Sequence, residues 1–168
     1  MEDQDLQRPG DPGPETPPGL APLCALRFSV ADITDVEALA PGRRVTLQII
    51  PGSEIDGARI RGHLLPGGTF TQTGRADNVV EVEGRFVIET DDNHHIAARS
   101  IGLISLPPRF AAQLARGKPY DPTELYARGA ILFEAAEGSP YAWMNRGLYL
   151  VRTEWRGPHA YSTVWRVQ

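Results

Sequence analysis

Short runs of apolar and β-branched residues, separated by turn residues, follow one another from Leu23 to the end of the chain. Most runs have a length typical of β-strands, and pairs such as Pro41-Gly42 and Pro51-Gly52 stand between them. Asp92-Asn93 fits a tight hairpin, because asparagine tolerates the positive φ of a primed turn. The pattern predicts strands at residues 23–30, 43–51, 57–66, 78–90, 94–105, 126–136, 141–153 and 159–167.

Only two segments have a pattern typical of helices. Residues 32–40 could form a short helix capped by Asp32. Residues 108–116 begin with proline, which the first helical turn accepts, and end before Gly117. We therefore expect a mainly β protein with one short helix near residues 108–116.

About eight strands with short connections favour a closed antiparallel β-barrel over alternating strands and helices. Closure removes exposed sheet edges, and eight strands leave room for side chains and one small ligand. A β-sandwich is the alternative architecture. Residues 1–22 are rich in proline and poor in apolar side chains, so we expect a disordered tail before a single domain at 23–168.

The composition limits the classes of partner. The chain has 168 residues, a mass of 18.4 kDa and a net charge of −4, which gives no electrostatic reason to expect nucleic acid or an anionic membrane. It lacks an apolar run of about 18 residues and a basic, apolar signal sequence at its start. Cys24 is the only cysteine, so no intrachain disulfide can form. We expect a cytoplasmic protein.

The run 141–153 is the strongest candidate for the wall of a pocket. If it is a strand, alternation places Tyr141, Trp143, Asn145 and Tyr149 on one face. Aromatic planes with phenol and amide groups suit the binding of an organic substrate. In the alternative interpretation, these aromatic residues pack under the helix and Asn145 satisfies buried backbone groups.

Two charged residues on predicted strands are candidates for catalysis. Glu134 would have a raised pKa in an apolar lumen and could then act as a general acid or base, although a glutamate on a strand can also simply face water. Arg85 alternates with Glu81, Glu83 and Glu89, which favours a solvated face. In a polar lumen its guanidinium could instead bind an enolate or a carboxylate.

Asp91, Asp92, His94 and His95 have residue types that bind metals, but they crowd a predicted hairpin turn. Adjacent strand residues point to opposite faces, so only Asp92 and His94 could share a side, which is too few ligands for a closed zinc site. No glycine-rich phosphate loop stands between a strand and a helix. We expect neither a metal nor a cofactor.

Motifs stand at residues 52–57, 62–68, 84–92, 133–134 and 141–146. In order and spacing, these motifs resemble those of the DUF3237 (UPF0311) family of small β-barrel proteins. Two positions depart from the family pattern: Phe70-Thr71 stands where members commonly carry Asp-Trp, and Asn93 replaces a turn glycine. If that aspartate acts in the chemistry of other members, this chain lacks it.

The resemblance implies a barrel, with a homodimer as one option, related to barrels that enclose small organic ligands. Some similar barrels act without cofactors as cyclases, isomerases or lyases on natural-product intermediates. That analogy sets a prior expectation and does not assign a function.

The leading hypothesis is a cofactor-independent enzyme that catalyses cyclisation, isomerisation or elimination on a small natural-product or polyketide-like molecule in the lumen. Glu134 or Asp56 would transfer the proton, and Tyr141 and Asn145 would stabilise charge on oxygen. The alternative is a non-catalytic, lipocalin-like barrel, which would lack an ionisable group near its ligand. A third option is an interaction module whose interior is filled by its own side chains.

Overall fold

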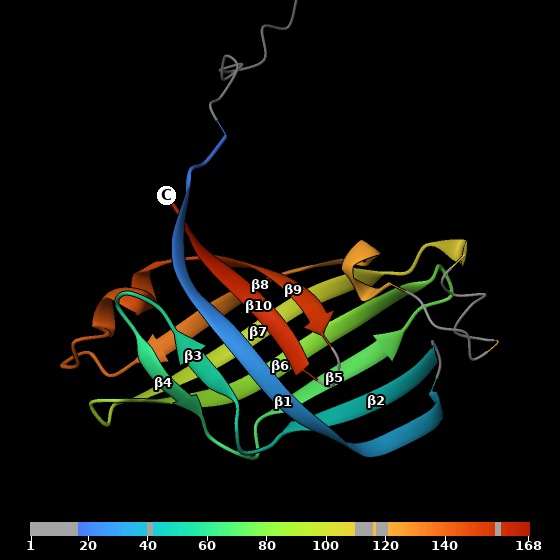
Figure 1. Ribbon diagram of the computed structural model, residues 1–168, viewed down its shortest axis with the longest axis horizontal. Helices are drawn as coiled ribbons and strands as arrows, with labels where there is room; N and C mark the ends of the chain where they lie inside the picture. Colours follow the sequence, from blue (N-terminus) through green and yellow to red (C-terminus); the bar gives the residue numbers. More distant parts are fainter. Residues whose placement is uncertain (1–16, 40–41, 110–115, 117–120, 157–158) are drawn as a thin grey trace, which may run out of the picture.

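The protein is a single antiparallel sheet that closes into a barrel (Figure 1). The computed structural model describes residues 17–39, 42–109, 116, 121–156 and 159–168. Two short 3-10 helices, η1 (Pro122–Glu124) and η2 (Ala142–Arg146), accompany the strands. The strands are β1 (Leu20–Leu39), β2 (Gly42–Ile49), β3 (Glu54–Asp56), β4 (Arg61–Leu64), β5 (Thr69–Gly74), β6 (Val79–Thr90), β7 (His95–Ser105), β8 (Tyr126–Ala135), β9 (Tyr149–Arg156) and β10 (His159–Val167).

Eight strands surround the axis at either end of the barrel, although ten are present. The long strands β1 and β6 each change partner part-way along: β1 pairs with β3 and then β2, and β6 pairs with β5 and then β4. Pairing of β1 with β10 closes the ring. The predicted closed barrel is therefore confirmed, with β3 and β4 completing one end and β2 and β5 completing the other (Figure 1).

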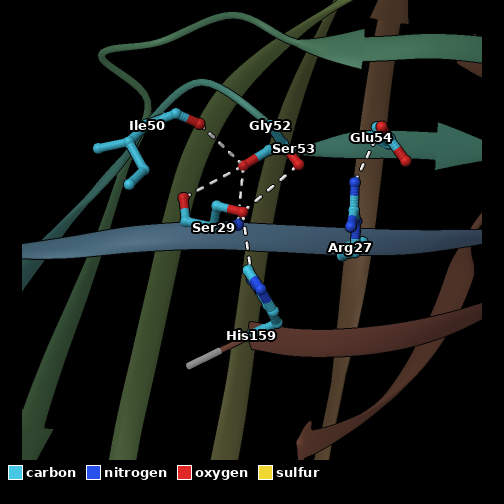
Figure 2. A network of polar contacts seen from close by, with 7 residues as sticks. All are labelled: Arg27, Ser29, Ile50, Gly52, Ser53, Glu54 and His159. Carbon is cyan, nitrogen blue, oxygen red and sulfur yellow. Dashed lines mark hydrogen bonds and ion pairs between the residues drawn. The ribbon is translucent and has the colours of Figure 1, made fainter. Parts of the chain in front are cut away.

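A buried serine holds the point where β1 changes partner (Figure 2). The backbone N–H of Ser29 donates to Oγ of Ser53 at 2.9 Å, and that hydroxyl lies 3.1 Å from the carbonyl oxygens of Ser29 and Ile50. On the other side of β1, Oγ of Ser29 lies 3.2 Å from Nδ1 of His159. These contacts satisfy backbone groups that the interrupted ladder leaves without a strand partner.

The end completed by β3 and β4 is filled with side chains. η2 lies at this end, and Met144 from η2 and Tyr149 from β9 are fully buried. The ring of Phe133 meets that of Tyr149 edge to face, with centroids 5.0 Å apart. Other residues here with almost no exposed surface are Leu26, Ile55, Ile60, Leu64, Ile88, Ile96 and Val164.

Two sequence predictions about elements are wrong. Residues 32–39 are strand, not helix, because they continue β1 and pair with β2, for example Thr34 with Thr46. Residues 141–148 are not strand: η2 occupies most of this stretch, and β9 begins only at Tyr149. Strands β3 and β5 were not predicted as separate elements. The turn at Asp92-Asn93 is confirmed, with Asn93 at φ 62°.

Other predictions concern segments that are described only in part. The expected helix at 108–116 falls mainly on residues 110–115, which lie outside the described residues, as do residues 1–16 of the expected tail. The barrel begins slightly before the predicted boundary, because Leu20 already pairs with Val167. In the described part of the chain, no helix is long and apolar enough to span a bilayer.

Candidate ligand-binding cavity in the barrel lumen

The half of the barrel completed by β2 and β5 contains a cavity of about 100 Å³. Its existence follows from the size of the side chains that alternation directs inward. Gly102 on β7 and Gly129 on β8 occupy inward positions directly opposite each other and line the cavity. With no side chain at these two positions, the wall recedes and leaves space in the lumen. Gly84 on β6 also points inward, but the ring of Phe70 and Oγ of Ser100 fill the space beside it, since a Cβ there would lie 2.5 Å and 2.4 Å from them.

Aromatic and aliphatic side chains form most of the remaining wall. Phe28, Phe70 and Phe86 pack against one another, with ring centroids 4.9 to 5.9 Å apart. These rings separate the cavity from the filled end of the barrel. The other apolar side chains at the cavity include Val30, Leu47, Val82, Ile104, Ala127, Ile131, Val151, Trp155 and Ala160.

Four neutral polar side chains also line the cavity: Gln72, Ser100, Thr153 and Ser162. Thr153 and Ser162 satisfy each other, with 2.7 Å between their hydroxyl oxygens. Gln72 and Ser100 form no side-chain hydrogen bond to another described residue. Ser100 is 9% exposed, so its hydroxyl is largely removed from solvent and remains available for a guest.

None of the described side chains that point into this cavity is ionisable. Arg128 borders the cavity through its backbone, but its guanidinium lies over the exposed ring of Tyr126, 5.1 Å from the centroid. The lumen is therefore apolar with neutral hydrogen-bonding groups. Its chemistry suits an uncharged guest, since a buried charge without a partner is strongly unfavourable.

The three residues expected to perform catalysis all lie on the outside of the barrel. Glu134 is exposed on β8, and Arg85 is exposed on β6, where both border a shallow outer groove beside the turn at residues 65–68. Asp56 is exposed on β3 and pairs with Arg61 at 3.0 Å. Strand parity explains this placement, because the neighbours Phe133, Phe86 and Ile55 are the buried ones.

Three of the four expected substrate-binding residues lie at the filled end, in or beside η2. Tyr141 donates a 2.8 Å hydrogen bond to Oδ1 of Asp92, and burial followed by this bond raises the pKa of its phenol. The guanidinium of Arg59 lies 3.7 Å from the centre of Trp143. Asn145 accepts from the backbone N–H of Ala135 and donates to its carbonyl, which is the alternative role considered for it.

Tyr149 does point inward, but into the filled end. It has no exposed surface, burial raises the pKa of its phenol, and its hydroxyl lies 3.4 Å from the carbonyl of Met144. A ligand in the cavity could not reach it without displacing Phe133 and Ile131. The structure thus brings none of the seven predicted site residues to the cavity.

The predicted site did not include Ser100, Gln72, Thr153 and Ser162, although the sequence contains part of the signal. In the strand predicted at 94–105, the alternate positions Ile96, Ala98, Ser100, Gly102 and Ile104 carry a stretch of small residues between two large ones. Small inward residues on adjacent strands indicate free volume. Recognising them needed the register between strands, which the sequence does not contain.

The described residues offer little support for metal binding or for chemistry at the single cysteine. Within the described residues, no group of three or more His, Cys, Asp or Glu side chains is positioned to hold a metal ion. Cys24 is buried at the filled end, and burial together with the charge of Asp56 raises its pKa to about 12. Its thiol is therefore protonated and weakly reactive at neutral pH.

Comparison with known proteins identifies the family. The sequence profile of the family described as "Protein of unknown function (DUF3237)" matches residues 18–167. The chain belongs to this family. A UPF0311 protein of Rhodopseudomonas palustris is 30% identical over 121 residues, which are 72% of this chain and 78% of that protein. The resemblance of the motifs to the DUF3237 family is therefore confirmed.

Solved structures share the barrel. The crystal structure of a conserved protein of unknown function from Rhodopseudomonas palustris has a TM-score of 0.81 at 26% identity and covers 92% of this chain and 100% of its own. An enzyme from Penicillium herquei has a TM-score of 0.64 at 17% identity, covering 92% and 97%. At that identity the likeness concerns the fold alone.

Proposed function

We propose that this DUF3237 protein binds a small, uncharged and largely apolar organic molecule in the half of its lumen completed by β2 and β5. The observation that carries the proposal is an apolar cavity lined by Ser100, whose side chain is 9% exposed and forms no hydrogen bond to another described residue, with no ionisable side chain among the described residues that face it. Ser100 would hydrogen-bond an oxygen or nitrogen of the guest, and the phenylalanine rings would supply apolar contact.

The volume restricts the size of the guest. An engineered apolar cavity of about 150 Å³ accommodates benzene, so a cavity of similar scale suits a molecule of about one ring. A polycyclic or polyketide-like intermediate would require movement of the wall. We therefore favour a compact molecule with one or two polar atoms.

Proton-transfer catalysis, the leading hypothesis from the sequence, receives less support. It requires a general acid or base within hydrogen-bond reach of the substrate. Glu134 and Asp56 lie on the outer surface, and the described lumen offers only hydroxyl and amide groups. The fold shared with an enzyme from Penicillium herquei keeps a catalytic role open, but no residue of the described lumen favours it.

The proposal is tested by binding measurements with ligands of matched shape and different charge. Phenol, benzyl alcohol and acetophenone represent neutral guests, and benzoate and benzylamine are their charged counterparts. Trp155 lines the cavity, so its fluorescence and the shift in melting temperature both report binding. We expect the neutral compounds to bind and the charged ones to fail.

Two further measurements separate binding from acid–base catalysis. Ser100→Ala should weaken the binding of benzyl alcohol by roughly 2- to 10-fold, the effect of one hydrogen bond, and leave toluene binding unchanged. Thr163→Ala, on the outer face of β10, serves as the control. Affinity should stay constant between about pH 5 and 9, because no described lumen group titrates there. Equal binding of benzoate, no binding by any compound, or conversion of a bound guest would overturn the proposal.

A further inference from the structure

The outer face of β7, β8 and β9, together with Leu148 just before β9, exposes a continuous set of apolar side chains. Ile101 is 62% exposed and Leu148 is 47% exposed, and Ala130 lies between Ile101 and Leu150 in the strand register. Isolated exposed apolar residues are ordinary, but a contiguous set marks an interaction surface. We call this set the outer apolar patch; it consists of Ile101, Leu103, Ala130, Leu132, Leu148 and Leu150.

Charged side chains without an ion-pair partner border the patch. Arg85 on β6 lies directly opposite Arg99 on β7, an arrangement of like charges that is destabilising on a sheet. Glu83, Glu134 and Arg128 stand nearby on the same outer face. Among the described residues, none of these five side chains forms an ion pair.

We propose that two copies of this chain pair face to face through the outer apolar patch. The strand register gives the symmetry. Gly84, Ser100, Ile131 and Tyr149 form one row across β6 to β9. The proposed two-fold axis lies between the two molecules and runs above this row, across the strands. Rotation about it brings each outward residue of one molecule opposite a residue on the same strand of the other molecule, equally far from the row but on its other side.

Under this axis the surface is complementary to itself. Arg85, one residue past the row, faces Glu83 of the partner subunit, and Glu134, three residues past it, faces Arg128 of the partner subunit. Leu132 meets Ala130, and Leu148 meets Leu150, so apolar residues occupy the centre. Each charge pair occurs twice, so Arg85 gains an acidic neighbour from the partner subunit. Arg99 faces Ile101 of the partner subunit.

The outer of these two charge pairs cannot form within one chain. Glu134 and Arg128 lie six residues apart on β8, which is about 20 Å along a strand. Their complementarity therefore requires a second molecule, and the matched spacing on both sides of one row points to an identical one. Face-to-face packing of sheets at about −30° is a common geometry that tolerates the twist of both barrels.

The size of the surface predicts a dimer of modest affinity. Four strands and four outward rows span roughly 14 Å by 20 Å between backbone positions. With its rim, this surface falls at the lower end of specific interfaces, which typically bury about 800 Å² on each partner. We expect a dissociation constant in the micromolar range, independent of any ligand in the lumen.

Sedimentation velocity of the full chain over a range of concentrations tests this proposal. The mass should rise with concentration from 18.4 kDa towards twice that value. Ile101→Arg should weaken association at least about tenfold, because it places a guanidinium opposite Arg99 of the partner subunit at the centre of the contact. Ile50→Arg is the control, since Ile50 is 37% exposed but lies at the turn after β2, away from the patch. Melting curves confirm that the variants are folded.

A charge exchange gives the decisive comparison. Glu134→Arg and Arg128→Glu should each weaken the dimer, because each places like charges opposite one another. The double variant restores opposite charges across the axis and should recover the affinity of the unaltered protein to within about threefold. A protein that stays monomeric, a dimer insensitive to Ile101→Arg, or a double variant as weak as the single ones would overturn the proposal.

Discussion

At the scale of single residues, Asp92 is the centre of a set of hydrogen bonds between the β6–β7 turn and the residue that begins the turn into η2. Its Oδ1 accepts from the hydroxyls of Thr90, at 2.6 Å, and Tyr141, at 2.8 Å. These bonds favour the carboxylate and lower the pKa of Asp92 below its usual value. Asp92 was considered as a metal ligand and Tyr141 as a pocket residue, and in the structure their hydrogen bond connects two loops.

The lowered pKa of Asp92 predicts a pH dependence of stability. A carboxyl with a depressed folded pKa contributes stability above its unfolded pKa of about 3.9 and loses it as the pH falls through the folded pKa. Asp92→Asn should therefore lower the free energy of unfolding at neutral pH, and the difference from the unaltered protein should shrink below about pH 4.

Urea unfolding of both proteins at neutral and acidic pH measures this difference. Asp91→Asn is the matched control, because Asp91 makes no side-chain hydrogen bond to a described residue. It should change stability little at either pH. If the difference in unfolding free energy between Asp92→Asn and the unaltered protein stayed constant down to low pH, the hydrogen bonds would not favour the ionised form of Asp92.

At the scale of elements, the strands with strong alternation were predicted to within a few residues, such as 78–90 and 159–167. The failures have physical causes. Residues 32–39 carry signals for a helix cap, but antiparallel pairing with β2, the next strand along the chain, decides their conformation, and Leu39 already pairs with Gly42. Such tertiary contacts override local propensity.

The strand predicted at residues 141–148 was wrong for a different reason. Its aromatic and apolar residues alternate as they would on a strand, yet Met144 enters the core from a 3-10 turn, and Asn145 takes over hydrogen bonds to Ala135 that a neighbouring strand would otherwise make. Alternation alone could not separate these two arrangements. Because the candidate binding residues were placed by that alternation, the error passed directly from the element to the site.

A glycine in β4 controls how closely two strands approach. Gly62 has φ +157°, and a Cβ there would lie 2.1 Å from the carbonyl oxygen of Glu89 and 2.7 Å from Cα of Thr90. Backbone atoms of β6 cannot move aside as a flexible side chain could. Gly62→Ala should therefore destabilise the protein by about 1–3 kcal/mol or more.

Chemical denaturation of Gly62→Ala measures the loss. Gly138→Ala provides the control, because no atom lies within 4 Å of a Cβ built at Gly138. Its stability should stay within about 0.5 kcal/mol of the unaltered protein. Similar midpoints for the two variants would mean that β4 and β6 separate easily, and the close approach would then not explain the glycine.

At the scale of the whole molecule, the exchange of partners by β1 and β6 divides one barrel into two unlike halves. The half with β3 and β4 is a packed core that η2 covers, and the half with β2 and β5 is hollow and carries the cavity. Eight strands can enclose either arrangement, so the size of the inward residues determines which one forms. The outer apolar patch lies on the strands that run the length of both halves.

This division predicts different responses to the same substitution along one strand. Ile96 and Ile104 both lie on β7 and both point inward, but Ile96 is fully buried in the packed half, whereas Ile104 is 8% exposed and lines the cavity. Ile96→Ala should cost about 2–5 kcal/mol of unfolding free energy, because it opens a new void among packed side chains. Ile104→Ala removes atoms that already face empty space, so its cost should be about 1–2 kcal/mol, near the transfer value alone.

Urea denaturation gives both values, and ligand binding adds an independent readout. Ile104→Ala enlarges the cavity and should admit a bulkier neutral guest such as 2-naphthol, while Ile96→Ala should leave the choice of guest unchanged. Because the two variants share strand, residue type and direction, secondary-structure propensity cancels between them. Equal losses of stability, together with equal effects on binding, would show that packing is uniform along the barrel and that the hollow half is closed to guests.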